Sequence, residues 1–449
     1  MERNGSLEQK NVLTDTILSA RRMVFVRRRA LKEFIGYAMQ TYGLTALGLL
    51  AAIALVRMVS AEAYGMYGAA MAWAGVLGMF AHGGSVPLLV PRLLSHRPTP
   101  DERSLWLAYV RSVPPIFFTL ALAGALVLSV FHSPVFGAYV IMALCAMQGY
   151  NLLQILPLPE ARDRRMGPYL WVDSFAQMSR VLIPVATVAV VGSITGYFIG
   201  LLVAPLIVVI GLCFFPYWRK RIIAYFCGTK SATAPWSNRA AVALEGIGAM
   251  FETGAATLYA SVSLLTSSSF LGWADVAQLK ILIGFSAVAM LCFAPYLKWI
   301  SLHLPRYLRQ SAHPFRIFIK YSVIGGLIGC LIYGVFLALA PILIPFVYGA
   351  SYVGVIPLVL GGGLMLIWSG FSVCLSIISK MYGLIWPYAL VSIVNLAIGV
   401  GFALSPIGPR TLVGMSWFYG LWLLPPIVVC YAMAYHRLRS LRHMEILVG

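Results

Sequence analysis

Charged residues are scarce in this chain: they make up 10% of its 449 residues, and only 14 of them are Asp or Glu. A soluble domain carries about 25% charged residues, so the chain has too few polar side chains to cover a water-soluble fold. Hydrophobic residues make up 60% of it, and its mean hydropathy is +0.86. The composition indicates an integral membrane protein and excludes most classes of soluble enzyme.

Signatures of cofactor, metal and nucleotide sites are also missing. Six of the 7 cysteines lie in apolar runs, without the paired spacing of a disulfide framework or a zinc site, and the 7 histidines are scattered. No Walker sequence is present, so ATP hydrolysis by that motif is excluded. We expect no cofactor, no metal site and no catalytic residues, and so a protein that is not an enzyme. Transport against a gradient would then need a proton or sodium gradient.

The chain does contain a series of long apolar runs bounded by charges, Gly or Pro. A membrane-spanning helix needs about 20 apolar residues, so these runs predict an all-α polytopic membrane protein. We place twelve spans near residues 34–57, 63–90, 106–131, 135–157, 169–192, 194–217, 239–263, 275–300, 317–347, 351–377, 380–405 and 411–435.

Basic residues outnumber acidic ones by 33 to 14, and the formal charge is +19. With a cytoplasmic amino terminus, the outer side holds only Arg57, Lys280 and Arg410, and Arg180 lies within a span. This bias predicts that both termini are cytoplasmic, and the positive excess indicates contact with anionic membrane lipids and not with nucleic acid. The basic segment 1–33 is either an interfacial helix on such lipids or a partly disordered arm.

The pattern of runs repeats at an offset of about 214 residues. Ser60–Tyr64 after the first span is echoed by Leu271–Asp275 after the seventh. Because each half has an even number of spans, both halves face the same way, which predicts two six-helix lobes related by a pseudo-two-fold axis along the membrane normal. The expected units are the amino-terminal segment 1–33, an N-lobe 34–217, a basic cytoplasmic linker 218–238, a C-lobe 239–435 and a cytoplasmic tail 436–449.

Three short stretches resemble a known family. Ala54–Tyr67 contains Arg57, Ser60-Ala-Glu62 and Tyr64-Gly, which is similar to the signature that closes the first helix of polysaccharide flippases, with Ala61 at the usual proline position. Gly83–Arg92 and Phe346–Tyr352 resemble two further blocks of that family. The chain is thus similar to the Wzx-like branch of the multidrug/oligosaccharidyl-lipid/polysaccharide exporters.

The resemblance implies a flippase of the bacterial inner membrane that moves undecaprenyl-pyrophosphate-linked oligosaccharide from the cytoplasmic to the periplasmic leaflet for exopolysaccharide or O-antigen export. It also implies alternating access, partners among polysaccharide polymerases and glycosyltransferases, and a cationic cavity between the lobes. The first alternative is a multidrug/toxin exporter of the same superfamily. The second is a membrane polysaccharide polymerase or ligase, for which the outer loops are short.

Cations within spans are the first candidates for a substrate site, because burying a charge in a membrane is costly without a partner or a function. Arg180 shares a helix face with Asp173, but the two lie roughly 10 Å apart along the axis, too far to pair. A guanidinium can bind phosphate oxygens bidentately, so we expect Arg180 to bind the pyrophosphate, or else to bond carbonyls or an acid on a neighbouring helix. Arg57 and Lys280 either assist it or extend to lipid headgroups.

Acidic and amide side chains within spans form the second group of candidates. Glu245, Glu252 and Asp173 are expected to carry the coupling cation, since burial favours their protonated form, or else to pair with Arg180 or Lys280. Amides could face the glycan or simply join helices; these are Gln40, Gln148, Asn151 and Gln177.

Overall fold

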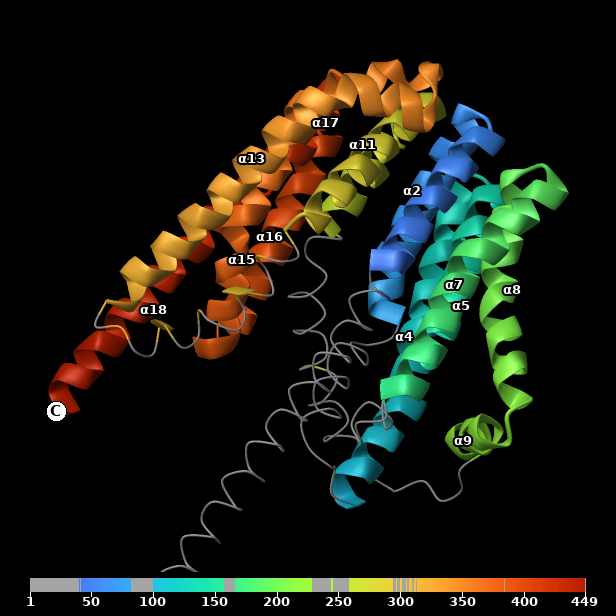
Figure 1. Ribbon diagram of the computed structural model, residues 1–449, viewed down its shortest axis with the longest axis horizontal. Coiled ribbons are helices and arrows are strands. Elements are labelled where there is room, and N and C mark those ends of the chain that lie inside the picture. Colours follow the sequence, from blue (N-terminus) through green and yellow to red (C-terminus); the bar gives the residue numbers. More distant parts are fainter. Residues whose placement is uncertain are drawn as a thin grey trace, which may run out of the picture.

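The computed structural model describes residues 42–81, 100–156, 166–227, 258–293, 313–382 and 384–448, together with positions 40, 244, 296, 299, 300, 304, 307, 308 and 311. Within these residues all regular structure is helical (Figure 1). This agrees with the expected all-α fold, since in lipid only a helix satisfies its backbone polar groups within one segment.

The first half of the chain begins with an apolar helix over Tyr42–Met58. It continues with α2 (Ala61–Ala81), α4 (Pro100–Phe131), α5 (Pro134–Ile155), α7 (Met166–Val191), α8 (Ile194–Cys213) and the short basic α9 (Pro216–Cys227).

The second half begins with an apolar helix over Leu258–Ser267. It continues with α11 (Trp273–Leu291), α13 (Pro314–Tyr348), the 3₁₀ turn η1 (Ala350–Val355), α14 (Leu358–Gly362), α15 (Leu364–Tyr382), α16 (Ile385–Leu404), α17 (Leu412–Leu421) and α18 (Leu424–Val448).

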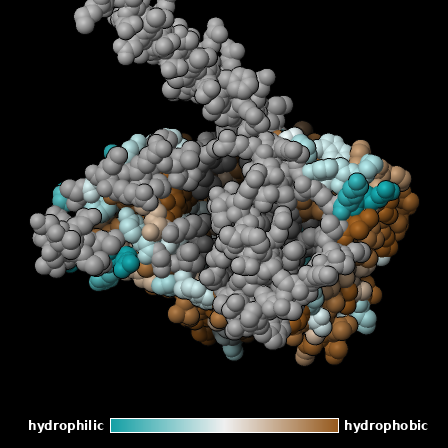
Figure 2. Space-filling view, turned by 90° about the horizontal axis from the view of Figure 1, so that it is seen from below, coloured by the Kyte–Doolittle hydropathy of each residue, from teal (hydrophilic) through white to brown (hydrophobic). Residues whose placement is uncertain are grey.

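Eight helices in the described part of the chain are long and apolar enough to cross a membrane. Large apolar side chains are exposed along them, including Leu206, Leu331 and Ile398, at 58%, 69% and 59%. Figure 2, seen from the end where the two halves diverge, shows hydrophobic side chains over the flanks and hydrophilic ones at the rim. The chain is a multi-span membrane protein, and the count of twelve spans stays a prediction.

Two of the predicted spans are broken in the structure. The run 351–377 is divided into η1, α14 and α15, with Gly363 between the last two. The run 411–435 is divided into α17 and α18 by a turn just before Pro425 and Pro426. A proline lacks the N–H donor that the hydrogen bonds of a helix need, and a glycine backbone bends easily. Both breaks lie inside runs of uniform hydropathy, so the hydropathy pattern predicted one unbroken span at each place.

The two halves form two arms that touch at one end and diverge toward the other (Figure 1). The same neighbours recur in both arms: α4 packs on α5 as α13 packs on α15, α5 packs on α8 as α15 packs on α18, and α7 packs on α8 as α16 packs on α18. The duplicated unit and the predicted lobe boundaries, which lie partly outside the described residues, stay predictions.

The joined end is held by contacts between α2 and α11. Gly65 lies directly against the carbonyl of Trp273, so close that a side chain at this position would overlap it. The Trp273 ring stacks on Phe136 of α5 at 5.8 Å between ring centroids. One apolar core runs through both halves here, whereas a second core, around Phe318 and Ile378, contains described residues of the second half only. The halves are therefore joined at one end and packed separately toward the other.

The α7–α8 hairpin holds one wall of the first arm in place. Gly192 turns the chain with a φ of +71°, a conformation that favours glycine. Gly196 and Gly200 then lie against the α7 backbone at Thr187 and Pro184, leaving no room for a side chain, and Thr187 Oγ1 donates to the Gly196 carbonyl at 2.7 Å. Small residues allow such close helix contact in membranes, and here they position Arg180 of α7 beside α8.

Candidate functional site

A pair of tyrosines lies where α2 and α8 meet. The rings of Tyr67 and Tyr197 are 4.7 Å apart, edge to face, and the Tyr67 hydroxyl donates to that of Tyr197 at 3.4 Å. Phe198 beside them is fully buried and stacks on Tyr139 at 4.4 Å, which fixes this part of α8. Both tyrosines are half-buried, and their hydroxyls meet each other between α2 and α8.

Arg180 of α7 contacts a third tyrosine, Tyr150, and lies near the pair. Its guanidinium carbon lies 5.5 Å from the centre of the Tyr150 ring on α5, a cation–π arrangement. It also interacts electrostatically with Tyr67 and Tyr197. Arg180 is half-buried, and no acidic side chain of the described residues forms an ion pair with it.

Lys280 reaches the same tyrosine from the other half of the chain. Its Nζ lies 5.8 Å from the centre of the Tyr67 ring. The lysine stem packs over Gly68 of α2, where a Cβ would come within 3.1 Å of Lys280 Cγ. Lys280 thus lies inside α11, half-buried between the two halves, and not in an outer loop.

Two of the three predicted phosphate-binding cations, one from each half, thus lie near the tyrosine pair. Lys280 lies over the Tyr67 ring, and Arg180 lies over Tyr150 with Tyr67 within range of its charge. Among the described residues neither Arg180 nor Lys280 has a carboxylate partner, so the cluster has a net positive charge. Guanidinium and ammonium groups donate to phosphate oxygens, and tyrosine hydroxyls can add further hydrogen bonds. The chemistry of this cluster suits an anion.

Arg57, the third predicted cation, lies elsewhere. Its Nη2 donates a 2.6 Å hydrogen bond to the carbonyl oxygen of Phe346 at the end of α13, and its side chain is exposed. Because this bond joins the first half to the second at the joined end, Arg57 links the two halves in this structure.

Asp173 lies on α7 next to two of the predicted glycan-facing amides. Gln40 Nε2 donates to Asp173 Oδ2 at 2.7 Å, and Gln177 is a second hydrogen-bond partner of this carboxylate. Gln40 Oε1 is buried without a partner in the described part of the chain. Asp173 is thus held by amides in this structure.

The remaining candidates divide into two groups. Gln148 Nε2 donates to the carbonyl of Ala81 at 2.7 Å and so ties α5 to the end of α2, while Asn151 lies half-buried one turn further along α5. Glu245 and Glu252 lie outside the described residues, so their predicted role in ion coupling stays a prediction.

The tyrosines are the residues that sequence reasoning missed. Tyr64 and Tyr67 stood within the family-like stretch, but Tyr139, Tyr150 and Tyr197 lie in separate apolar runs. Tyrosine is common in such runs, so composition did not distinguish them. A useful signal would have been the spacing of Tyr64 and Tyr67, which places two phenol groups on one face of a helix.

Comparisons with known proteins give little further information. No protein-family model matches the chain, and no curated protein matches it. Among solved structures the chain is similar to "Lipid II flippase MurJ, inward closed conformation", with a TM-score of 0.49 and 14% identity over 92% of this chain and 93% of that one. A likeness at this level assigns neither a family nor a function.

Proposed function

We propose that the chain is a flippase of the bacterial inner membrane that translocates undecaprenyl-pyrophosphate-linked oligosaccharide, by alternating access, for polysaccharide export. The observation that carries the proposal is the convergence of Arg180 and Lys280, from opposite halves, on the Tyr67–Tyr197 pair. A lipid-linked pyrophosphate must keep its charge neutralised while it passes through hydrocarbon. Two cations without a carboxylate partner in the described residues would do this.

The position of the cluster suits a carrier whose halves move relative to each other. Arg180 belongs to the first arm and Lys280 to the second, so a ligand held by both would couple the arms. The arms are joined at the end that we predict to be periplasmic, through Gly65, Trp273 and Arg57. Opening this end while closing the other would transfer access from the cytoplasmic to the periplasmic leaflet.

Coupling to a proton or sodium gradient is the second part of the proposal. Asp173 lies on the same face of α7 as Arg180, about two turns away, and has only amide partners among the described residues. Protonation of this carboxylate would change the charge beside the site without breaking an ion pair. Glu245 and Glu252 are proposed for the same role on sequence grounds alone.

The test is flipping in proteoliposomes. The proteoliposomes contain undecaprenyl pyrophosphate that carries a fluorescent disaccharide. External dithionite quenches the fluorophore of lipid in the outer leaflet, and the quenched fraction is followed over time. We expect Arg180→Gln and Lys280→Gln each to lower the rate about ten- to a hundredfold, since a hydrogen bond to a charged group contributes about 1.5–3 kcal/mol. Arg180→Lys should recover part of the rate.

Arg410→Gln is the matched control. It also removes one guanidinium, but the described partners of Arg410 are the carbonyls of Leu404 and Ser405 and the ring of Phe270, all in its own half, so its rate should not change. Equal rates for all variants would exclude the cluster as the pyrophosphate site. Efflux of a cationic dye in place of lipid flipping would favour the multidrug exporter, and elongation of the glycan would favour the polymerase or ligase.

A further inference from the structure

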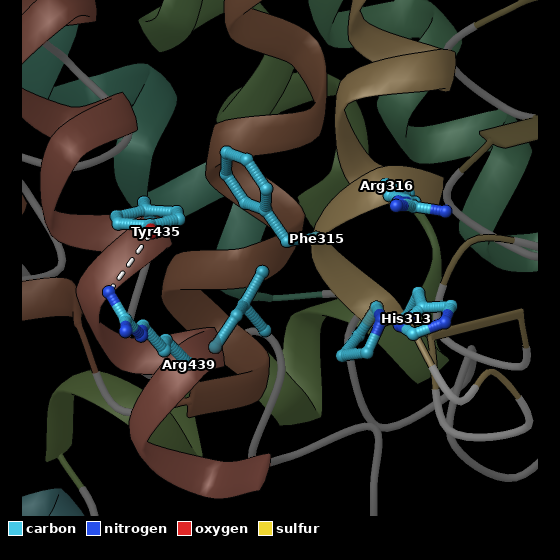
Figure 3. A pocket seen from close by; sticks show the side chains of 7 residues that line it. His313, Phe315, Arg316, Tyr435 and Arg439 are labelled. Atoms are coloured by element: carbon cyan, nitrogen blue, oxygen red, sulfur yellow. Dashed lines mark hydrogen bonds between the residues drawn. The ribbon is translucent and has the colours of Figure 1, made fainter.

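A basic cavity lies between the first turn of α13 and the last part of α18, far along the sequence from the Arg180–Lys280 cluster. It measures about 240 Å³ and is lined by His313, Pro314, Phe315, Arg316, Tyr435, Leu438 and Arg439. Figure 3 shows Tyr435 and Arg439 from α18 on one side of Phe315 and His313 and Arg316 from α13 on the other. Nothing in the proposed transport mechanism uses these residues.

The depth of the cavity corresponds to a headgroup region. The apolar span of α13 starts at Pro314, and the apolar span that ends in α18 finishes at Arg439. Both limits fall on residues that line the cavity, so the cavity lies at the ends of two candidate membrane spans, beyond the most apolar parts of their helices. Molecules that can occupy such a position have a polar head beside an apolar body.

The walls of the cavity have an apolar part and a charged part, which suits a molecule with an apolar body and a polar head. Leu438 is almost fully buried at 1% exposure, and Phe315 packs edge to face on Tyr435 at 4.8 Å between ring centroids. Arg316 and Arg439 are exposed. Arg439 Nη1 donates to the Tyr435 hydroxyl at 3.3 Å, which orients the guanidinium and leaves its other N–H donors for a ligand.

The charge of the lining is of one sign. It contains two arginines and a histidine, and no Asp or Glu is among the residues that line it. The first turn of α13 also begins here, and the partial positive charge of a helix amino terminus adds to that of the arginines. Basic pockets between spans on the cytoplasmic side are suited to anionic lipid headgroups.

We propose that this cavity binds the phosphate headgroup of an anionic membrane phospholipid, with Arg316 and Arg439 on the phosphate and Phe315 and Leu438 against the start of the acyl chains. The bound lipid bridges α13 and α18 and so fixes the open end of the second arm. This site is independent of the transported substrate. Its ligand is a phospholipid of the surrounding membrane.

Native mass spectrometry of the purified full chain tests the proposal. The protein is titrated with phosphatidylglycerol and, separately, with phosphatidylethanolamine. We expect a first phosphatidylglycerol to bind more tightly than phosphatidylethanolamine, and Arg316→Gln/Arg439→Gln to weaken it about 25-fold, at about fivefold for each cation near an anionic lipid. Both side chains are exposed, so the variant should fold, which size-exclusion chromatography checks.

The matched control is Lys320→Gln/Arg437→Gln. It removes the same charge from the same two helices, at exposed positions that do not line the cavity, and should change binding little. An equal loss of phosphatidylglycerol binding in both double variants would show that general surface charge causes the effect, and it would overturn the proposal. Displacement of the lipid by an equal concentration of glycerol 1-phosphate would also overturn it, because the site would then recognise a free phosphate ester.

Discussion

Arg57 and Phe346 join the two halves of the protein through one hydrogen bond, from Nη2 of the arginine to the carbonyl oxygen of Phe346 at 2.6 Å. The residues lie 289 positions apart in the chain. Arg410 at the same end binds two carbonyls as well, but both belong to its own half. The same chemistry thus links the arms in one case and closes a local turn in the other.

Arg57→Gln should make the joined end open more often. An exposed hydrogen bond contributes about 1 kcal/mol, so the open population should rise about fivefold. A cysteine introduced at Ala69, which is fully buried in α2, reports the opening through its rate of labelling by a membrane-impermeant maleimide in a background without the native cysteines. Arg410→Gln should leave that rate unchanged, and an equal increase in both variants would contradict the role of Arg57 as a link.

Gly65→Val should disrupt the same end by steric overlap. A side chain at Gly65 would overlap the Trp273 carbonyl of the other half, and overpacking typically costs about 1–3 kcal/mol. Since the halves can separate, we expect faster labelling at Ala69 with a small change in melting temperature. Gly284→Val in α11 is the control, because nothing lies within 4 Å of its Cβ position. A melting temperature that drops sharply without faster labelling would show that Gly65 packs a rigid core.

Gln40→Leu should destabilise the protein through Asp173. The change removes the donor at 2.7 Å and leaves a half-buried carboxylate less satisfied, at a cost of about 1–3 kcal/mol. The double variant Gln40→Leu/Asp173→Leu should recover part of the loss, because the carboxylate that lacked a donor is then removed and only the Gln177 amide loses a partner. Thermal unfolding in detergent gives the stabilities of the unaltered protein, the two single variants and the double variant. Strictly additive effects would mean that the two side chains do not interact.

Asn395→Leu should loosen the second arm. Asn395 Nδ2 donates to the Tyr259 hydroxyl at 3.0 Å and to the backbone carbonyl of Trp422 at 3.2 Å, and the substitution removes both bonds. The bond from Trp422 Nε1 to the backbone carbonyl of Asn395, at 3.1 Å, is kept. Hydrogen bonds between membrane helices contribute about 0.6–1.7 kcal/mol each, so the melting temperature should fall clearly. Ser405→Ala, which affects only a bond within its own helix end, should melt like the unaltered protein.

Hydropathy alone located the helices closely. The run 169–192 is α7 over Met166–Val191, and the run 317–347 is α13 over Pro314–Tyr348. This success has a physical cause: in hydrocarbon a segment must satisfy its own backbone, so a long apolar run has one available conformation. The breaks at Gly363 and before Pro425 escaped notice because they leave hydropathy unchanged.

Composition and hydropathy are sufficient to predict a helical membrane protein with an excess of positive charge, and to predict that Arg180 and Lys280 lie within spans, where burying a charge costs free energy. The packing of the helices established what those patterns leave open. Lys280 lies over Tyr67 and Arg180, 100 residues earlier in the chain, lies over Tyr150 near it, while Arg57 binds Phe346. Composition and periodicity are local properties of a helix. The partner of a side chain depends on how helices from the two halves pack, and that packing follows from close contacts such as Gly65 with Trp273, which no local pattern encodes.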